Sequence, residues 1–73
     1  MKAILEFNLP EDQHEYDIMV ESSRMYLALH DMKQELRHEW KHGDLSQAEW
    51  NIVDKIRERF FEILQENNVN LDL

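Results

Sequence analysis

Residues 11–42 contain neither glycine nor proline, the two residue types that interrupt helices most readily. Apolar side chains recur along this stretch at helical spacing, at Met19, Tyr26, Leu29, Leu36 and Trp40. One apolar stripe of this kind predicts a long amphipathic helix. Ser22 and Ser23 are its weakest point, because serine side chains compete for backbone hydrogen bonds. We therefore expect one helix bent at the serines, or alternatively a short helix followed by a long one.

Local signals predict where the helices begin and end. Pro10, followed by two acids, predicts the start of the first helix, and Gly43 suits the left-handed position that ends one. Ser46 and Glu49 have the spacing of a capping box, which predicts that a second helix begins there. Its apolar face comprises Trp50, Val53, Ile56, Phe60, Ile63 and Leu64. The short link predicts an antiparallel helical hairpin, with the second helix fading at Asn67–Asn68.

Both ends of the chain alternate apolar and polar residues, which is the pattern of half-buried strands. Residues 3–9 and 69–73 are therefore predicted to be short β-strands that pair antiparallel beside the hairpin. The predicted fold class is α+β, mostly α, in a single domain of residues 1–73. A lone two-stranded ribbon is marginal in water and leaves two open edges, so we expect a homo-oligomer, with a dimer favoured.

The charge of the chain restricts its partners. Sixteen acids and eight bases give a formal net charge of −8, which repels nucleic acid and anionic membranes and favours proteins with basic surfaces. No apolar run approaches the roughly 20 residues that cross a bilayer, and the N-terminus lacks the features of a secretion signal. Cysteine is absent, so disulfides cannot reinforce so small a fold. We expect neither secretion nor membrane insertion.

Acidic residues are the candidate partner-binding groups. Residues 6–21 contain six acids and no lysine or arginine, which concentrates negative charge at one end of the molecule. The predicted second helix carries acids every four residues, a spacing that weakens a helix and so calls for another explanation. Such a row can imitate a nucleic-acid backbone, although nearby bases favour an ordinary solvated face. The candidate residues are Glu11, Asp12, Glu15, Asp17, Glu21, Asp54, Glu58, Glu62 and Glu66.

Residues 38–42 match the zincin pattern H-E-x-x-H. In this interpretation His38 and His42 bind zinc, Glu39 is the general base, and Glu62 supplies a third ligand. The alternative is a helix that ends in histidines because cations suit the C-terminal end of the helix dipole. We favour the alternative and predict no metal and no cofactor.

Two segments carry a resemblance to a known family. Residues 5–13, LEFNLPEDQ, and residues 29–37, LHDMKQELR, resemble a family of small uncharacterised proteins of tailed bacteriophages and prophages. The resemblance spans nearly the whole chain. It implies a phage-encoded protein in the cytoplasm of the bacterial host, and it transfers no activity or catalytic residues. The family usually has tryptophan at the position of His30 and a lysine-tyrosine pair near His42, which implies that the zincin pattern is not a family property.

The sequence therefore favours a non-enzymatic accessory protein that binds a host or phage protein with a basic surface. Inhibition of a defence or nucleic-acid-processing enzyme is the form of binding that the phage context suggests. A zinc-dependent hydrolase is the second interpretation. The third is a self-assembling module that holds a small ligand between subunits, with cations gathered at the interface from Arg24, Lys33, Arg37, Arg57 and Arg59.

Overall fold

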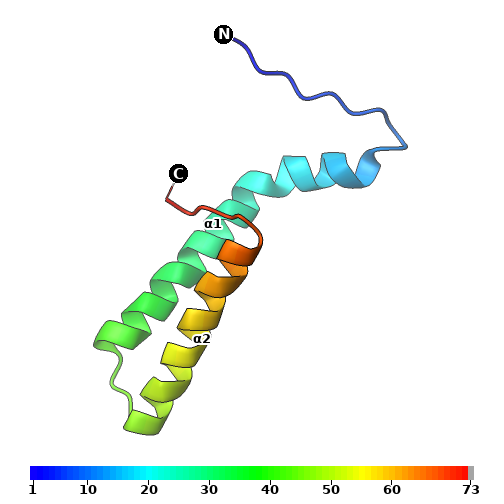
Figure 1. Ribbon diagram of the computed structural model, residues 1–73. Helices are drawn as coiled ribbons and strands as arrows, with labels where there is room; N and C mark the ends of the chain where they lie inside the picture. The colour runs from blue at the N-terminus through cyan, green and yellow to red at the C-terminus, as the bar shows by residue number, and fades with distance from the viewer. Residues whose placement is uncertain (73) are drawn as a thin grey trace.

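The computed structural model describes residues 1–72, which contain two helices and no strand. Helix α1 spans Gln13–His42 and helix α2 spans Gln47–Glu66. The two helices lie antiparallel, and α1 continues well beyond the end of α2 (Figure 1). The predicted helical hairpin is confirmed.

The predicted terminal strands are wrong within the described residues, and Leu73 lies outside them. Residues 1–8 form an extended arm that leads away from the hairpin, whereas the C-terminal tail folds back over α1 (Figure 1). The prediction assumed that the outer ends of the helices coincide. Because α1 has 30 residues and α2 has 20, the two chain ends leave the hairpin at different heights and never meet.

The first helix begins three residues later than Pro10, because a turn precedes it. The Asp12 N–H donates to the carbonyl oxygen of Asn8 at 2.7 Å, and the Asn8 N–H donates to the Asp12 carboxylate at 2.9 Å. The Phe7 ring then lies edge-on against Tyr16, with 5.7 Å between centroids. These contacts join the end of the arm to the first turn of α1.

Helix α1 is continuous through the two serines, so the bent helix is the alternative that the structure supports. Figure 1 shows α1 changing direction in its cyan part, where the colour bar places residues 20–25. The Ser22 hydroxyl donates to the Met19 carbonyl oxygen at 2.7 Å. A serine bonded back to the preceding turn commonly bends a helix.

Gly43 does not have the left-handed conformation that its position suggested. Its φ and ψ are −67° and 140°, an extended conformation open to any residue. Glycine is needed here for space, because a Cβ would lie 2.5 Å from the Glu39 carbonyl oxygen and 2.8 Å from Glu39 Oε2. The capping box that follows is confirmed: the Glu49 N–H donates to Ser46 Oγ, and the Ser46 N–H donates to the Glu49 carboxylate, both at 3.2 Å.

The left-handed residue lies instead at the end of α2. Asn68 has a φ of 55°, its N–H donates to the Gln65 carbonyl oxygen, and the Val69 N–H donates to that of Leu64 at 2.8 Å. This pair of bonds is a Schellman motif, which ends the helix and turns the chain back. The predicted end of α2 at Asn67–Asn68 is confirmed.

The C-terminal tail packs onto α1. Leu71 is 4% exposed, the Tyr26 hydroxyl donates to its carbonyl oxygen at 3.1 Å, and Lys33 forms an ion pair with Asp72 at 3.0 Å. Among the described residues only Leu71 and Leu64 are buried hydrophobics. The single chain therefore has a very small core.

Candidate protein-binding site

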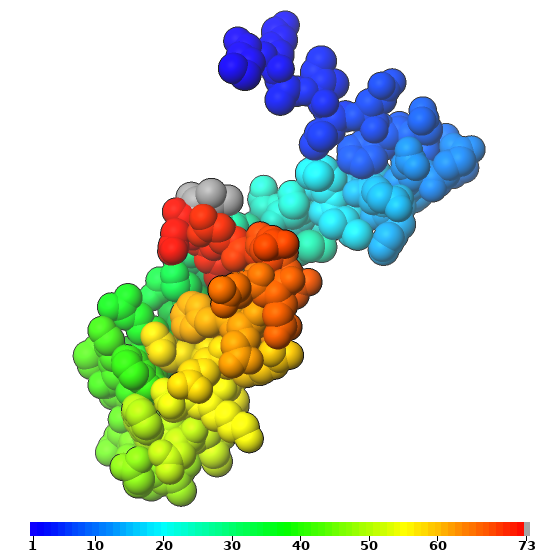
Figure 2. Space-filling view, in the orientation of Figure 1, coloured from blue at the N-terminus to red at the C-terminus, as the bar shows by residue number. Residues whose placement is uncertain are grey.

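The most prominent surface is the N-terminal part of α1, which extends past the end of α2. We call residues 11–24 the projecting segment. In Figure 2 its blue and cyan atoms extend away from the rest of the molecule, and α2 covers none of them in this view. Because an isolated helix of this length is marginal in water, its apolar side chains need a partner surface.

The projecting segment carries the five N-terminal candidate acids. Glu11 and Glu15 are exposed, and neither has a hydrogen-bond or ion-pair partner among the described residues. Asp17 accepts a hydrogen bond from the Gln13 amide at 2.9 Å, and Asp12 is occupied in the turn before the helix. Glu21 forms an ion pair with Arg24 at 3.2 Å, on side chains that are largely exposed. Glu11 and Glu15 are therefore the two carboxylates of this segment that are fully open to a partner.

The same segment also exposes large apolar side chains. Ile18, Met19 and Val20 are between 43% and 59% exposed, and Tyr16 is 40% exposed. Scattered exposed apolar residues are ordinary, but a cluster rimmed by polar groups marks an interaction surface. The acids of this segment were predictable from the sequence. Its exposed apolar side chains were not, because the spacing of Met19 places it on the buried stripe predicted for this helix.

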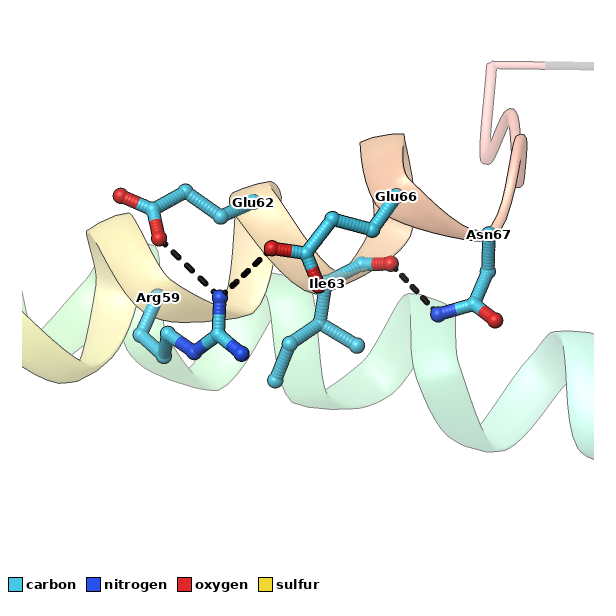
Figure 3. Close-up of polar contacts among 5 residues, drawn as sticks. All are labelled: Arg59, Glu62, Ile63, Glu66 and Asn67. Carbon is cyan, nitrogen blue, oxygen red and sulfur yellow. Dashed lines mark hydrogen bonds and ion pairs between the residues drawn. The ribbon is translucent and has the colours of Figure 1, made fainter.

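The acidic row on α2 is divided between different roles. Asp54 accepts a hydrogen bond from the Trp40 indole N–H at 2.8 Å, inside the hairpin. Arg59 contacts both Glu62 and Glu66, at 3.1 and 2.9 Å (Figure 3), and these hydrogen bonds raise the pKa of the Arg59 guanidinium. Glu58 is exposed and has no partner in the described part of the chain. The row therefore does not present four equivalent free carboxylates.

A cluster of aromatic rings and one arginine beside the hairpin turn was not predicted from the sequence. Trp40 and Trp50 stack with 6.1 Å between centroids, and the Trp50 indole N–H donates to the Trp40 carbonyl oxygen. The Arg57 guanidinium lies 4.3 Å from the Trp40 ring centroid and 5.1 Å from that of Phe61. Arg57 therefore packs against aromatic rings of the hairpin, whereas the sequence placed it among the cations of a ligand interface. The sequence signal for this cluster was the pair of tryptophans, Trp40 and Trp50, on either side of the turn.

The zincin residues do not converge. The rings of His38 and His42 lie 5.7 Å apart between centroids, as their one-turn spacing requires. Trp50 lies beside Trp40 at this end of the hairpin, and Glu62 is twelve residues beyond Trp50, about 18 Å along α2. In residues 1–72 no three histidine or acidic side chains are grouped closely enough to hold a metal.

The cations proposed for a ligand site also lie apart. Arg24 and Arg59 pair with glutamates, Lys33 pairs with Asp72, and Arg57 is enclosed by aromatic rings. Arg37 lines a separate shallow hollow with Gln34, His38, Lys41 and His42. No single cationic pocket forms from these five residues within the described chain.

Comparison with known protein families, with curated proteins and with solved structures finds no significant match. Neither described helix combines the length and apolar character needed to cross a membrane. The resemblance to phage proteins remains a prediction.

Proposed function

We propose that this chain is a non-enzymatic accessory protein that binds another protein through the projecting segment. The observation that carries the proposal is the combination, on one helix that extends beyond the hairpin, of open carboxylates and exposed apolar side chains. Amphipathic helices are a common recognition element, with apolar contacts giving affinity and charges giving orientation.

The partner chemistry that fits is a basic protein surface. The projecting segment carries five acids and one arginine, so its net charge of −4 is half of the −8 of the whole chain. Opposite charges accelerate encounter and exclude partners of the wrong sign. A protein that handles nucleic acid has such a surface. Together with the phage resemblance, this supports a host defence or nucleic-acid-processing enzyme as the target, met in the bacterial cytoplasm.

The test is capture of binding proteins from bacterial host lysate by the wild-type chain and two charge variants. One variant carries Glu11→Gln, Glu15→Gln and Asp17→Asn in the projecting segment. The control carries Asp31→Asn, Glu35→Gln and Glu58→Gln, which removes the same charge from exposed positions elsewhere. We expect the first variant to lose most of the captured partner and the control to retain it.

Salt provides the second arm of this test. Raising the ionic strength from about 0.1 M to about 1 M shortens the Debye length from about 10 to about 3 Å. Over this range of ionic strength, the wild-type chain should lose captured partner. The Glu11/Glu15/Asp17 variant has already lost most of its partner at low salt, so its capture should change little. Equal loss in the two triple variants, or binding that is insensitive to salt, contradicts the proposal.

A further inference from the structure

The single chain exposes far more surface than a compact protein of its mass. Its accessible surface is 6552 Å² for 8.9 kDa. A compact monomer of that mass exposes about 4,800 Å², which leaves an excess of about 1,700 Å². The Cα radius of gyration is 17.1 Å, against about 11 Å for a compact chain of this length. A standard interface removes about 800 Å² from each partner, so the excess is enough for a large, stable one.

Part of the exposed apolar surface lies on one side of the hairpin, which we call the apolar face. On α2, Ile52, Ile56 and Ile63 recur at intervals of four and seven residues and are between 43% and 60% exposed. On α1, Met32 is 51% exposed. Met32, Leu36, Ile56, Arg59, Phe60 and Ile63 line one shallow hollow between the helices. The hollow is apolar apart from Arg59, and no other element of the described chain covers it.

The projecting segment carries the matching surface. Ile18, Met25 and Met32 follow one another at seven-residue spacing, so the stripe that borders the hollow continues along α1 into the projecting segment. Ile18 and Met25 are 45% and 46% exposed. From Gln13 to Arg24 the helix is about 17 Å long, which is enough to cross the hollow between Ile56 and Ile63, about 11 Å along α2. Each chain thus has an apolar stripe on the projecting segment and an apolar face on the hairpin. Neither is covered by another described helix of the same chain.

We propose that two copies of this chain associate antiparallel about a two-fold axis near Met25, with each projecting segment seated on the partner's apolar face. In this arrangement the Ile18 side chain packs near the partner's Met32 and Ile63. Each end of the dimer becomes a cluster of three helices. The contact is isologous, so both copies bury the same residues and no open filament results.

A second copy is the occupant because the interface completes the core of this chain. Within residues 1–72 only two hydrophobic residues are buried, which is too few to hold a 73-residue fold without disulfides or metal. A second copy of the chain supplies the missing apolar contacts without requiring any other protein. The one charged group lining the hollow, Arg59, already pairs with Glu62 and Glu66, so no external counter-charge is required.

This association differs from the one expected from the sequence, in which terminal strands paired across a ribbon edge. It involves the same projecting segment as the proposed function, and the two are distinguished by their tests, chain mass for self-association and lysate capture for partner binding. Asp17 lies about 100° around the helix from Ile18, at the rim of the interface. Glu21 lies about 60° from Ile18 and about 40° from Met25, directly beside the apolar stripe. The dimer would present two acidic segments at opposite ends.

Sedimentation equilibrium of the full-length chain tests the association. We expect twice the mass of the 8.9-kDa chain for the wild type. Ile18→Glu and Ile56→Glu should each shift the protein to the single-chain mass, because each buries a charge in the interface. The matched control is Leu27→Glu, a residue 60% exposed on α1 but two residues from Met25, and so on another side of the helix. The control should keep the two-chain mass.

Single cysteines test the antiparallel arrangement without disturbing the fold, since the chain has none of its own. Met25→Cys lies near the two-fold axis and should form a disulfide-linked dimer under mild oxidation. The two copies of Ile18→Cys should lie about 21 Å apart and remain unlinked, because a disulfide requires Cα atoms within about 7 Å.

Three results would overturn the proposal. The first is a single-chain mass for the wild type. The second is a two-chain mass that survives both Ile18→Glu and Ile56→Glu. The third is efficient disulfide formation between copies of Ile18→Cys, which indicates parallel helices.

Discussion

The indole N–H of Trp40 on α1 donates a 2.8 Å hydrogen bond to the carboxylate of Asp54 on α2. This contact joins the two helices near the hairpin turn, beside the stacked rings of Trp40 and Trp50. An acid that belongs by spacing to a surface row therefore forms a contact within the hairpin. Its role is distinct from that of the open carboxylates on the projecting segment.

Substitution of Asp54 should affect stability more than partner binding. Asp54→Ala removes the acceptor of a half-buried indole N–H, and we expect a loss of about 1 to 2 kcal/mol in the free energy of unfolding. Asp54→Asn keeps an acceptor oxygen and should lose less. Urea denaturation followed by tryptophan fluorescence measures both values. A larger loss for Asp54→Asn than for Asp54→Ala would contradict the hydrogen-bond account.

Arg57 should be replaceable by an uncharged side chain of similar length. Its guanidinium lies against Trp40 and Phe61, and its buried Nε has no hydrogen-bond partner. Arg57→Met keeps the packing and removes the unsatisfied donor, so stability should stay equal or rise by up to about 1 kcal/mol. Arg57→Ala loses the packing and should destabilise by about 1 to 2 kcal/mol. Thermal denaturation of the two variants compares them, and equal losses would contradict this interpretation.

Leu71 holds the C-terminal tail against the hairpin. Leu71→Ala should lower the free energy of unfolding by about 2 to 3 kcal/mol, because a buried leucine leaves a cavity. Val69→Ala, at a residue 38% exposed, is the control and should cost less than about 1 kcal/mol. Chemical denaturation of both variants provides the comparison. If both cost the same, the tail does not pack as described.

The capping box should make stability depend on pH in the acid range. Hydrogen bonds from the Ser46 hydroxyl and backbone amide hold the pKa of Glu49 below its usual range. The pKa of Glu49 is lower in the folded state than in the unfolded state. The contribution of the ionised Glu49 to stability is therefore complete above the usual glutamate value of about 4.3, and it is lost as the pH falls through the folded-state pKa.

Two variants isolate this effect. Glu49→Gln keeps a capping side chain and should equal the wild type near neutral pH, with less loss of stability in acid. Ser46→Ala should cost about 1 kcal/mol at neutral pH. Melting temperatures measured across the acid range give the difference curve. Parallel curves for the wild type and Glu49→Gln would show that Glu49 does not titrate as described.

The elements that were predictable from the sequence depend on neighbours within a few residues. The capping box joins Ser46 to Glu49, three residues away, so residue types and spacing were sufficient. The end of α2 is equally local, since Asn68 and Val69 bond back to Gln65 and Leu64. Gly43 was misassigned because a glycine after a helix has two explanations, a left-handed φ and a lack of room for Cβ.

The features that were not predictable depend on distant contacts. Alternation in residues 69–73 resembles a strand, but the seat that buries Leu71 is built partly by Tyr26 and Lys33 on α1. Arg57 has the spacing of a surface base, and only the opposite helix places Trp40 over it. The acids of the projecting segment were recognised from composition. Its exposure depends on α1 being longer than α2, and no local pattern reports that difference.

Hydrogen exchange of the backbone amides in residues 16–24, measured on the full-length chain over a range of protein concentrations, tests the claim that the projecting segment packs on a second copy of the chain. We expect slow exchange at high concentration, where the segment is seated on the second copy. Dilution should speed exchange towards that of an isolated helix of this length, which is marginal in water. Fast exchange at every concentration, or protection that does not change on dilution to the single-chain mass, would contradict the account.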